Sequence, residues 1–546
     1  MATILDLDQS TRPSAQTTCD VCIVGAGAAG LYLANRLAAT GLDVVVLEAG
    51  GLECGPGESV GIEPTFTGSR YRGATEGRAF GWGGSTSRWG GLVVPYSELD
   101  LRGETDAESS TWTHIVEVVK KRTNAVFVTL GLGNETDFRT LPDAKLHTYA
   151  NALHQSNIYT VAAEFLPFRR RNLTYLLSPN SCRTVTVYLN AVASRWFLAS
   201  GPNGRGIVEA VQATTRSGRQ LGVKTKCFVI AAGAIESARI LLEIDRTTGG
   251  HMIPRSAAIG HYLADHLSCP IAEVKFEDRE LAARLFGPVF VRGRMRSFRF
   301  IAADDVRCLP KHFSHFIFDM DNAGFRFAKD LLFSLQARTL SAVRFSEALS
   351  GINDLFALGY HRFVSSKLHI PSGTPTHLQL DIEQYPAWEN RVHLGEHADG
   401  FGRPIAVVHW HVREIDLENI RAVAERISGK WPNFSLGFPR LVPTDRTAAC
   451  QKPHDAYHPV GTCRMGSDSE ATVDLDLRVK GTANLFVLST GVFPGAGTAN
   501  PTFSMLCLGD LLAEQLADTL CSAKCAVNSR PFTVGPAPRL GSTQIR

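Results

Sequence analysis

The stretch DVCIVGAGAAGLYLANRLAATGLDVVVLEAG, residues 20–50, decides the fold of this chain. It opens with residues 20–24, a largely apolar run that predicts a buried strand, and Val44–Leu47 predicts a second strand. The second run is almost entirely β-branched, as is typical of a strand buried in a parallel sheet. Residues 31–40 predict a helix between the strands, which Gly41 ends. The segment is therefore expected to form a β-α-β unit.

The turn between the first strand and the helix has the spacing of a dinucleotide site. Gly25 permits a tight turn, Gly27 lets the backbone approach a pyrophosphate, and Gly30 lets the helix pack on the strand. The helix N-terminus offers unpaired N–H groups and a positive dipole end to phosphates, and Ala28, within the glycine turn, is expected to contact the cofactor. Glu48, at the end of the second strand, is placed to accept hydrogen bonds from ribose hydroxyls.

The acidic residue also limits the kind of nucleotide. Glu48, which Ala49 follows, would repel the 2′-phosphate of NADP, but it is compatible with both NAD and FAD. A second glycine-rich segment, residues 73–91, is too poor in side chains to pack as an element of its own. It must lie close against other groups, which indicates either a cofactor loop or a linker.

Residues 77–91, GRAFGWGGSTSRWGG, resemble the glycine-rich flavin loop of the glucose–methanol–choline (GMC) oxidoreductase family. The resemblance implies that the cofactor is FAD and that this loop contacts it. Small residues would let the backbone reach a large planar cofactor, and the Ser85 hydroxyl can donate to it. The loop residues expected at the cofactor are Arg78, Gly83, Gly84, Ser85 and Trp89.

Three further segments resemble the same family, and together the resemblance covers roughly residues 19–518. Residues 229–237, VIAAGAIES, are similar to its second signature, in which a strand turns into a helix over small residues. Residues 260–266, GHYLADH, and 389–394, ENRVHL, are similar to other family elements. The second signature adds Ala232 and Gly233 to the expected cofactor contacts.

Two segments near the C-terminus resemble the family's catalytic segments. Residues 457–466, YHPVGTCRMG, are similar to the one that carries the catalytic histidine. Residues 497–502, GTANPT, are similar to the one that carries a second active-site His or Asn. The resemblance thus implies that His458 and Asn500 form the catalytic pair. It also places the next two residues, Pro501 and Thr502, at the cofactor.

The residue types of this pair suit alcohol oxidation. An alcohol has so high a pKa that its hydroxyl proton must be removed as the hydride leaves the carbon. A neutral imidazole, with an ordinary pKa of about 6.5, suits such a base and contributes roughly 10² to 10⁴ in rate. The amide of Asn500 can donate to the substrate oxygen and hold its geometry. For His458 the alternative is a histidine packed in the core.

Asn500-Pro501 also predicts a helix start, because Asn is a favoured N-cap and Pro a favoured first helical residue. That helix is expected to run to about Leu516. Its N-terminus would direct positive charge toward the flavin pyrimidine edge, which becomes negative on reduction. A cap role and a catalytic role for Asn500 are therefore compatible, and a cap role alone is the alternative.

The chain departs from the family pattern at two positions. Some members bind FAD covalently through a histidine in a Ser-Thr-His-Trp region, which here is Ser87-Arg88-Trp89. Because arginine cannot make that bond, FAD is expected to bind non-covalently. Ser489 stands where many members carry an acidic residue. This makes the chain more similar to the pyranose-oxidase-like branch and favours sugars or other polyols as substrates.

Composition excludes several classes of function. The 546 residues carry a net charge of +3, with basic and acidic residues interspersed, so nucleic acid is not an expected partner. The 12 cysteines have neither the density of a disulfide framework nor zinc spacing, and no metal site is predicted. Cys19 and Cys22 have the spacing of a redox pair, but Cys22 lies in the first strand, which favours packing.

The ends of the chain carry no targeting or membrane signal. The N-terminus lacks the basic and apolar regions of a signal peptide. No apolar run approaches the ~18 residues that a membrane span needs. A soluble, cytoplasmic protein without a membrane partner is expected, and residues 1–18 and 526–546 are expected to be flexible.

These observations predict an α/β fold, α+β overall. A Rossmann-type FAD-binding domain is expected from three segments, 19–105, 180–265 and 450–518. Residues 106–179 and 266–449 are assigned to a substrate domain with a mainly antiparallel sheet, because several runs alternate apolar and polar residues. The β-like runs of the middle of the chain are 185–189, 227–231, 271–276, 312–320, 377–384 and 405–412, and a helix is expected over 330–348.

The predicted function is FAD-dependent oxidation of the CH–OH group of a sugar, polyol or other alcohol, secondary alcohols included. His458 would take the hydroxyl proton while hydride passes to flavin N5, and oxygen or another acceptor would reoxidise the flavin. Three alternatives stay open: a flavoenzyme of the same fold with a lyase-type reaction, a non-catalytic flavin-binding protein, and a nicotinamide dehydrogenase.

Overall fold

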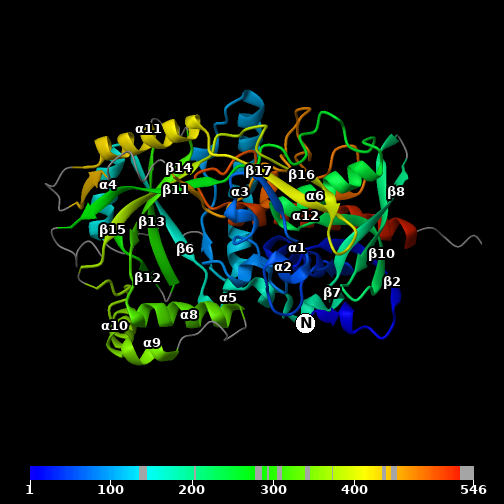
Figure 1. The fold of residues 1–546 in the computed structure, drawn as a ribbon, viewed down its shortest axis with the longest axis horizontal. Coiled ribbons are helices and arrows are strands. Elements are labelled where there is room, and N and C mark those ends of the chain that lie inside the picture. Colours follow the sequence, from blue (N-terminus) through cyan, green and yellow to red (C-terminus); the bar gives the residue numbers. More distant parts are fainter. Residues whose placement is uncertain are drawn as a thin grey trace, which may run out of the picture.

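Two large β-sheets lie side by side in the molecule, each covered by helices (Figure 1). The architecture is α/β, as predicted, with one sheet built around the β-α-β unit and the other antiparallel. The computed structural model describes residues 1–133, 144–201, 204–276, 286–291, 294–303, 310–337, 345–371, 373–432, 438–443 and 452–528.

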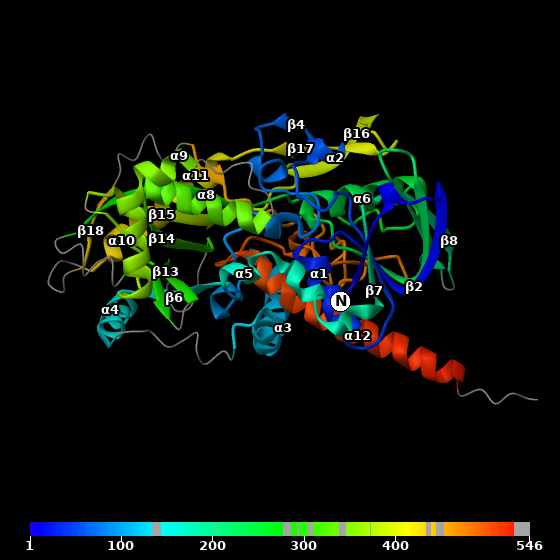
Figure 2. The same cartoon turned by 90° about the horizontal axis from the view of Figure 1, so that it is seen from below.

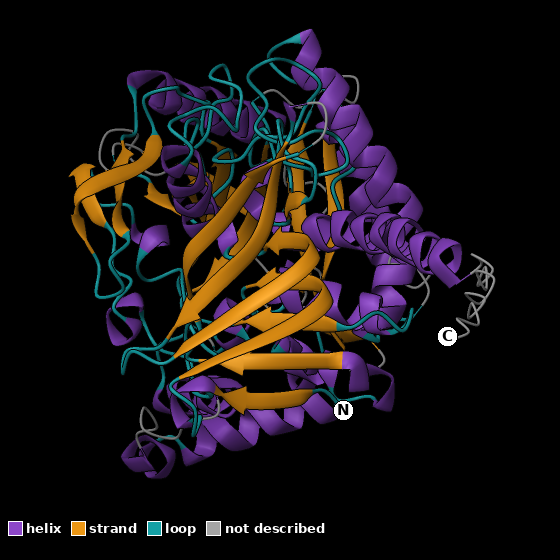
Figure 3. Ribbon diagram, turned by 90° about the vertical axis from the view of Figure 1, so that its right-hand side faces the viewer, coloured by secondary structure: helices purple, strands orange, loops and turns teal. Residues whose placement is uncertain are grey.

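The first sheet, called here the mixed sheet, has the strand order β1-β7-β3-β2-β10-β9-β8, with β20 paired to β10. Figure 3 shows the strands of the molecule in orange, with helices in purple around them. At its centre β2 (Ser14–Val24) and β3 (Val44–Leu47) run parallel and are joined by α1 (Ala28–Ala38), which confirms the predicted unit. The helix begins three residues earlier than predicted because the glycine motif itself forms its first turn. The other strands are β1 (Thr3–Asp6), β7 (Val185–Leu189), β8 (Val192–Ser200), β9 (Gly206–Thr214), β10 (Gln220–Ile230) and β20 (Leu485–Val487).

Helices cover both faces of the mixed sheet. α12 (Pro501–Asn528) packs on α1 and on α3 (Asp106–Leu130). α6 (Gly233–Thr247) lies on the opposite side (Figure 2). The strand β3 is buried along its whole length between these layers, which explains its purely apolar sequence.

The prediction that residues 1–18 are flexible is wrong. Thr3–Asp6 forms the edge strand β1, parallel to β7, and β2 already begins at Ser14. The side chains of β1 are exposed, so this strand is held by the backbone hydrogen bonds of the sheet edge. Backbone pairing of this kind leaves no hydrophobic pattern in the sequence.

The C-terminal helix is longer than predicted. α12 continues past Leu516 to Asn528, so it includes the first three residues of the segment 526–546 that was expected to be flexible. The rest of that segment, 529–546, lies outside the described residues.

The second sheet, called here the antiparallel sheet, has the strand order β18-β11-β15-β14-β13-β6-β5, with β12 and β19 at its sides. All its described pairings are antiparallel, as predicted. Its strands are β5 (Leu92–Val93), β6 (Ile158–Phe165), β11 (His266–Lys275), β12 (Val289–Val291), β13 (Arg294–Ala302), β14 (His312–Phe318), β15 (Thr376–Glu383), β18 (Arg440–Pro443) and β19 (His454–Asp455).

Helices also cover the antiparallel sheet. α11 (Glu414–Lys430) packs on β13 and β15, and three helices lie at the other side (Figure 1). These are α8 (Ala323–Ala337), α9 (Phe345–Ser350) and α10 (Ile352–Phe363). The helix predicted over 330–348 corresponds to parts of α8 and α9, and residues 338–344 between them lie outside the described residues. The remaining helices are α2 (Gly57–Val60), α4 (Ala144–Gln155) and α5 (Phe168–Arg171).

A small third sheet joins β16 (Arg391–Ala398), β17 (Pro404–Trp410) and β4 (Thr65–Gly68). It packs on α6 and therefore on the mixed-sheet side of the molecule. The predicted run 405–412 lies in this small sheet and not in the antiparallel sheet. The sequence could not assign it, because alternation indicates a half-buried strand but does not identify its partner. Among the described residues, none of the helices has the length and apolar character that crossing a bilayer requires.

Gly30 and Gly27 offer a test of the turn. A Cβ at Gly30 would lie 1.9 Å from the Gly25 carbonyl oxygen, whereas a Cβ at Gly27 would meet nothing within 4 Å. We expect Gly30→Ala to lower the free energy of unfolding by roughly 3 kcal/mol, because overpacking against backbone forces the turn to shift. Gly27→Ala is the matched control and should unfold within about 1 kcal/mol of the parent in chemical denaturation. Equal stabilities would contradict the packing role of Gly30.

Candidate active site

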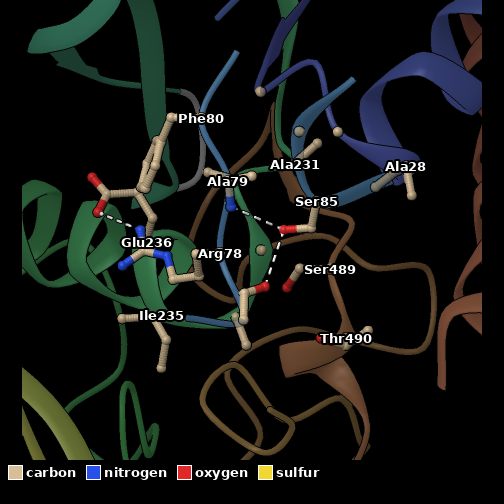
Figure 4. Close-up of a pocket in the computed structure, with 18 of the residues that line it drawn as sticks. Ala28, Arg78, Ala79, Phe80, Ser85, Ala231, Ile235, Glu236, Ser489 and Thr490 are labelled. Atoms are coloured by element: carbon tan, nitrogen blue, oxygen red, sulfur yellow. Dashed lines mark hydrogen bonds and ion pairs between the residues drawn. The ribbon is translucent and has the colours of Figure 1, made fainter. Parts of the chain in front are cut away.

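A cavity of about 550 Å³ extends from the glycine turn after β2 to His458 and Asn500. Its walls are the end of β3, the glycine-rich segment 73–91, the start of α6 and the start of α12. Figure 4 shows the part formed by the glycine-rich segment and the start of α6. This volume lies within the range of small-molecule sites in proteins. The cavity therefore joins the predicted nucleotide site to the predicted catalytic pair.

Two helix N-termini open onto this cavity without a side-chain cap. Gly27 is the N-cap of α1 and Ala232 is the N-cap of α6, and neither makes a side-chain capping bond. A Cβ at Gly27 or at Gly233 would meet no atom within 4 Å, so the backbone there faces open space. Unpaired N–H groups and a positive dipole end suit the phosphates of a dinucleotide.

Glu48 ties the glycine turn to the loops around it. Its buried carboxylate accepts the backbone N–H groups of Ala26 at 2.7 Å, Gly50 at 3.0 Å and Gly81 at 2.9 Å. Burial raises the pKa of Glu48 above its ordinary value, and these donors oppose that rise. Glu48 also lines the cavity, so its carboxylate lies where a ribose hydroxyl could donate to it.

The glycine-rich segment lies against the glycine turn. A Cβ at Gly84 would come within 2.9 Å of the Gly27 Cα, so this close approach requires glycine. The Ser85 hydroxyl donates to the Gly77 carbonyl and accepts from the Ala79 N–H, both at 3.2 Å (Figure 4). The hydroxyl predicted to donate to the cofactor thus donates within its own loop in this structure.

A buried ion cluster closes one side of the cavity. Glu236, at the start of α6, contacts Arg239 at 2.7 Å, Arg403 at 3.3 Å and Arg78 at 3.5 Å. Figure 4 shows its contact with Arg78. Burial alone would raise the pKa of Glu236, but the three guanidinium charges lower it to about 2. The sequence identified Arg78 and missed its partners, although a glutamate within the small-residue signature 229–237 was a signal.

The predicted catalytic residues meet at the other end of the cavity. The Asn500 amide Nδ2 lies 2.7 Å from His458 Nε2, although 42 residues separate the two in the chain. Tyr457, just before the histidine, has a left-handed φ of 62°, which is uncommon for an aromatic residue and is typical of functional turns. The backbone N–H of His458 donates to the buried carboxylate of Asp265. The pair is therefore held by contacts from several elements.

Burial keeps the histidines of this site neutral. Burial, together with the neighbouring His266 and Arg299, lowers the pKa of His458 to about 3, although the Asp381 carboxylate opposes this shift. Burial also lowers the pKa of His266 to about 4. Both rings are thus neutral at physiological pH, which leaves a lone pair on each.

Asp265, His266 and His458 form a group with the residue types of a metal site. The Asp265 carboxylate, however, accepts the N–H groups of His266, Ala456 and His458 and the Tyr71 hydroxyl. Its oxygens are committed to these donors, so we interpret the group as a hydrogen-bonded support for His458.

Two buried acids hold the loop that precedes Asn500. Glu383, at the end of β15, accepts the Gly497 N–H at 2.7 Å. Asp100 accepts the Thr498 N–H at 2.7 Å and its hydroxyl at 2.8 Å. Burial raises the pKa of Glu383 to about 7, although the Lys311 ammonium, 3.8 Å away, opposes the rise.

Most of the predicted site residues line the cavity: Gly25, Gly27, Ala28, Glu48, Ala49, Arg78, Gly84, Ser85, Trp89, Ala232, Gly233, His458, Asn500 and Thr502. Gly30, Gly83 and Pro501 lie outside its wall. Gly30 packs against Gly25, and Gly83 has a φ of 109° and packs against Asn172. Their position matches a role in packing rather than in contact with a ligand.

Several lining residues were missed. They include Ala191, Val192, Ala193, Arg403, Ser489 and Thr490. The first three follow the parallel strand β7, and ligands of such sheets bind at the carboxyl ends of strands. That signal becomes usable only when β7 is known to lie beside β3.

The raised pKa of Glu383 predicts a pH effect on stability. A carboxyl whose folded pKa of about 7 exceeds the unfolded value of 4.5 stabilises the fold below pH 4.5, and this contribution is lost as pH rises through 7. We expect the free energy of unfolding of the parent to fall by about 1–3 kcal/mol between pH 4.5 and 7 on account of this group, and Glu383→Gln to lack this fall. Denaturant unfolding of both proteins at a series of pH values measures the difference. Glu396→Gln, an exposed position on β16, is the control. Parallel pH profiles for parent and Glu383→Gln would refute the assignment.

Comparisons with known proteins agree with this geometry. Residues 386–509 match the family model described as GMC oxidoreductase, and residues 23–57 match that of an NAD(P)-binding Rossmann-like domain. The chain is 24% identical to 6'''-hydroxyparomomycin C oxidase of Streptomyces lividus, over 89% of each chain.

Two solved structures have the same fold. Pyridoxine 4-oxidase from Mesorbium loti aligns with a TM-score of 0.57 at 17% identity, over 91% of this chain and 99% of the other. Formate oxidase of Aspergillus oryzae, in a structure that concerns FAD modification, aligns with a TM-score of 0.55 at 14% identity, over 92% and 98%. These two likenesses show the fold, and the family match identifies residues 386–509, the segment that carries His458 and Asn500, as a GMC oxidoreductase domain.

Proposed function

We propose that this GMC oxidoreductase binds FAD non-covalently and oxidises the CH–OH group of an alcohol, with His458 as the base. One observation carries the proposal. The cavity that begins at a dinucleotide-type glycine turn ends at an imidazole and an amide in direct contact. A nicotinamide dehydrogenase would not require the second glycine-rich segment to form a wall of the same cavity.

The residues of the cavity fit FAD. The uncapped N-termini of α1 and α6 would hold the pyrophosphate, and Glu48 would accept from a ribose hydroxyl. Gly84 lies close against Gly27, so the glycine-rich segment approaches the turn that would hold the pyrophosphate without a side chain between them. When bound, FAD accepts the hydride and with it a negative charge that favours a protonated His458.

The protein's own groups handle the hydroxyl of the substrate. We infer that the hydroxyl enters between His458 Nε2 and Asn500 Nδ2, where the two groups now contact each other at 2.7 Å. Its hydrogen would then bond to the lone pair of Nε2, and its oxygen would accept from the amide. His458 takes the proton as the C–H bond breaks, while Asn500 holds the oxygen in place.

The substrate class follows from the residues and from one relative. The name 6'''-hydroxyparomomycin C oxidase describes a hydroxylated substrate. Together with Ser489 in the cavity wall, where an acidic residue is common in the family, it favours a sugar or another polyol. Oxygen or another small acceptor would reoxidise the flavin.

A lyase-type reaction is the second candidate function, and anaerobic mixing distinguishes it. Bleaching of the visible flavin absorbance by a panel of sugars, polyols and simple alcohols supports hydride removal. A substrate that is consumed while the flavin stays oxidised throughout would support the lyase.

Removal of the base tests the assignment of His458. We expect His458→Ala to retain the yellow flavin and to lose roughly 10² to 10⁴ in kcat, the usual contribution of a general base. The measurement is anaerobic flavin reduction with the best substrate of the panel. His454→Ala, at an exposed histidine four residues earlier, is the control and should stay near the parent rate. Near-normal turnover in His458→Ala would exclude this histidine as the base.

Acid precipitation tests the mode of flavin binding. Arg88 lines the cavity at the position where a histidine attaches the flavin in some relatives, and its guanidinium cannot form that bond. Trichloroacetic acid should therefore release the flavin into the supernatant in full. Yellow colour that stays with the pellet would show covalent attachment through another residue.

A further inference from the structure

The segment GHYLADH, residues 260–266, ends in a histidine that has no role in the proposed reaction. His266 is the first residue of β11 and is completely buried. Its Nδ1 lies 3.1 Å from Nδ1 of His458, with the two rings nearly perpendicular at 88°. The base is thus in direct contact with a second imidazole on its far side from Asn500.

The other nitrogen of His266 fixes the position of its proton. Nε2 lies 2.8 Å from the carbonyl oxygen of Gly497. A carbonyl can only accept, so Nε2 carries the hydrogen. Because burial lowers the pKa of His266 to about 4, the neutral ring has no second proton. Its Nδ1 is therefore a bare acceptor that faces His458.

This acceptor determines the tautomer of His458. Since His266 Nδ1 can only accept, His458 Nδ1 must carry the hydrogen and donate it. The neutral ring then has its lone pair on Nε2, which accepts from Asn500 Nδ2 at 2.7 Å. Every donor in this chain of contacts meets an acceptor.

The far end of the chain of contacts is fixed by a charge. The buried guanidinium of Arg299, on β13, donates to the Asn500 carbonyl Oδ1. Arg299 has only donors, so it orients the amide oxygen toward itself and the amide NH₂ toward His458. The same orientation follows independently from the His266 side, which makes the assignment unique.

We propose that His266 is a positioning residue, which holds His458 in the Nδ1–H tautomer and thereby presents the Nε2 lone pair to Asn500 and to the substrate hydroxyl. The inference rests on the proposed function of His458 as base. In the opposite tautomer Nε2 would carry a hydrogen and could not take a proton. Control of a base through the hydrogen bond on its other nitrogen is a recurrent feature of histidine catalysis.

A purely structural role for His266 is the competing explanation. Its Nε2 bond to Gly497 supports the loop that carries Asn500, and this bond alone could account for a buried histidine. The two roles use different ring nitrogens. Two amide substitutions can therefore separate them.

Asn and Gln at position 266 each keep the hydrogen-bonding group of one ring nitrogen and remove that of the other. In His266→Asn the amide oxygen takes the place of Nδ1 and keeps an acceptor for His458, while the bond to Gly497 is lost. In His266→Gln the amide NH₂ takes the place of Nε2 and keeps the bond to Gly497, while the acceptor is lost. The positioning role predicts that Asn preserves activity better than Gln, and the structural role predicts the reverse.

The kinetic experiment uses the flavin-loaded enzyme and the best alcohol of the substrate panel. We expect His266→Asn to stay within about tenfold of the parent kcat and His266→Gln to lose roughly 10² to 10⁴, the range for a base without its proton-accepting form. KM should change little in either, because the substrate contacts remain. Flavin absorbance per protein and the melting temperature report folding. Higher kcat in His266→Gln than in His266→Asn would overturn the proposal.

A second measurement does not depend on turnover. ¹⁵N-histidine NMR of the unsubstituted holoenzyme reports which nitrogen of His458 carries hydrogen, with His458→Ala identifying its signals. We expect only the Nδ1–H form in the parent, and a mixture of both tautomers in His266→Gln, where Asn500 alone still favours the Nδ1–H form. Hydrogen on His458 Nε2 in the parent would overturn the proposal. Activity in His458→Ala would instead refute the proposed function while leaving the tautomer result intact.

Discussion

The active site depends on two buried carboxylates that fasten one loop. Glu383 comes from the end of β15 in the antiparallel sheet and Asp100 from the segment between β5 and α3, and both accept backbone N–H groups of residues 497–498. The loop between these bonds and α12 carries Asn500. Because buried hydrogen bonds are costly to break, the loop is fixed relative to β15 and to the segment before α3 at once. The meeting of His458 and Asn500 follows from this fastening.

Ion pairing and burial act at opposite ends of the cavity. Glu236 is surrounded by three arginines, and its pKa is lowered to about 2. The two histidines at the catalytic end are kept neutral by burial, with Arg299 nearby as a positive charge. A neutral imidazole whose N–H is already donated can act further only as an acceptor, through the lone pair on its other nitrogen. Burial thus keeps His458 in its neutral form, and its hydrogen bonds determine which ring nitrogen carries the lone pair.

Several elements were predictable because their signal is local. The β-α-β unit, the bounds of β3 and the start of α12 at Pro501 depend on neighbouring residues and on glycine, asparagine and proline chemistry. The edge strand β1 was missed because its side chains are exposed and only backbone atoms hold it. The run 405–412 gave a strand but not its sheet, since alternation contains no information about the partner. Arg299 was not identified because nothing near it in sequence points to Asn500.

Short segments of the chain specify the nucleotide-type turn and the residue types at positions 458 and 500, and the family resemblance implies their pairing. The backbone and side-chain chemistry of these segments is set by neighbours in the chain. The orientation of the pair arises in the folded molecule alone. The contacts of His458 with His266 and of Asn500 with Arg299 join residues that are 192 and 201 positions apart. Directional hydrogen bonds between such distant groups exist only after both sheets have packed, so no local pattern encodes them.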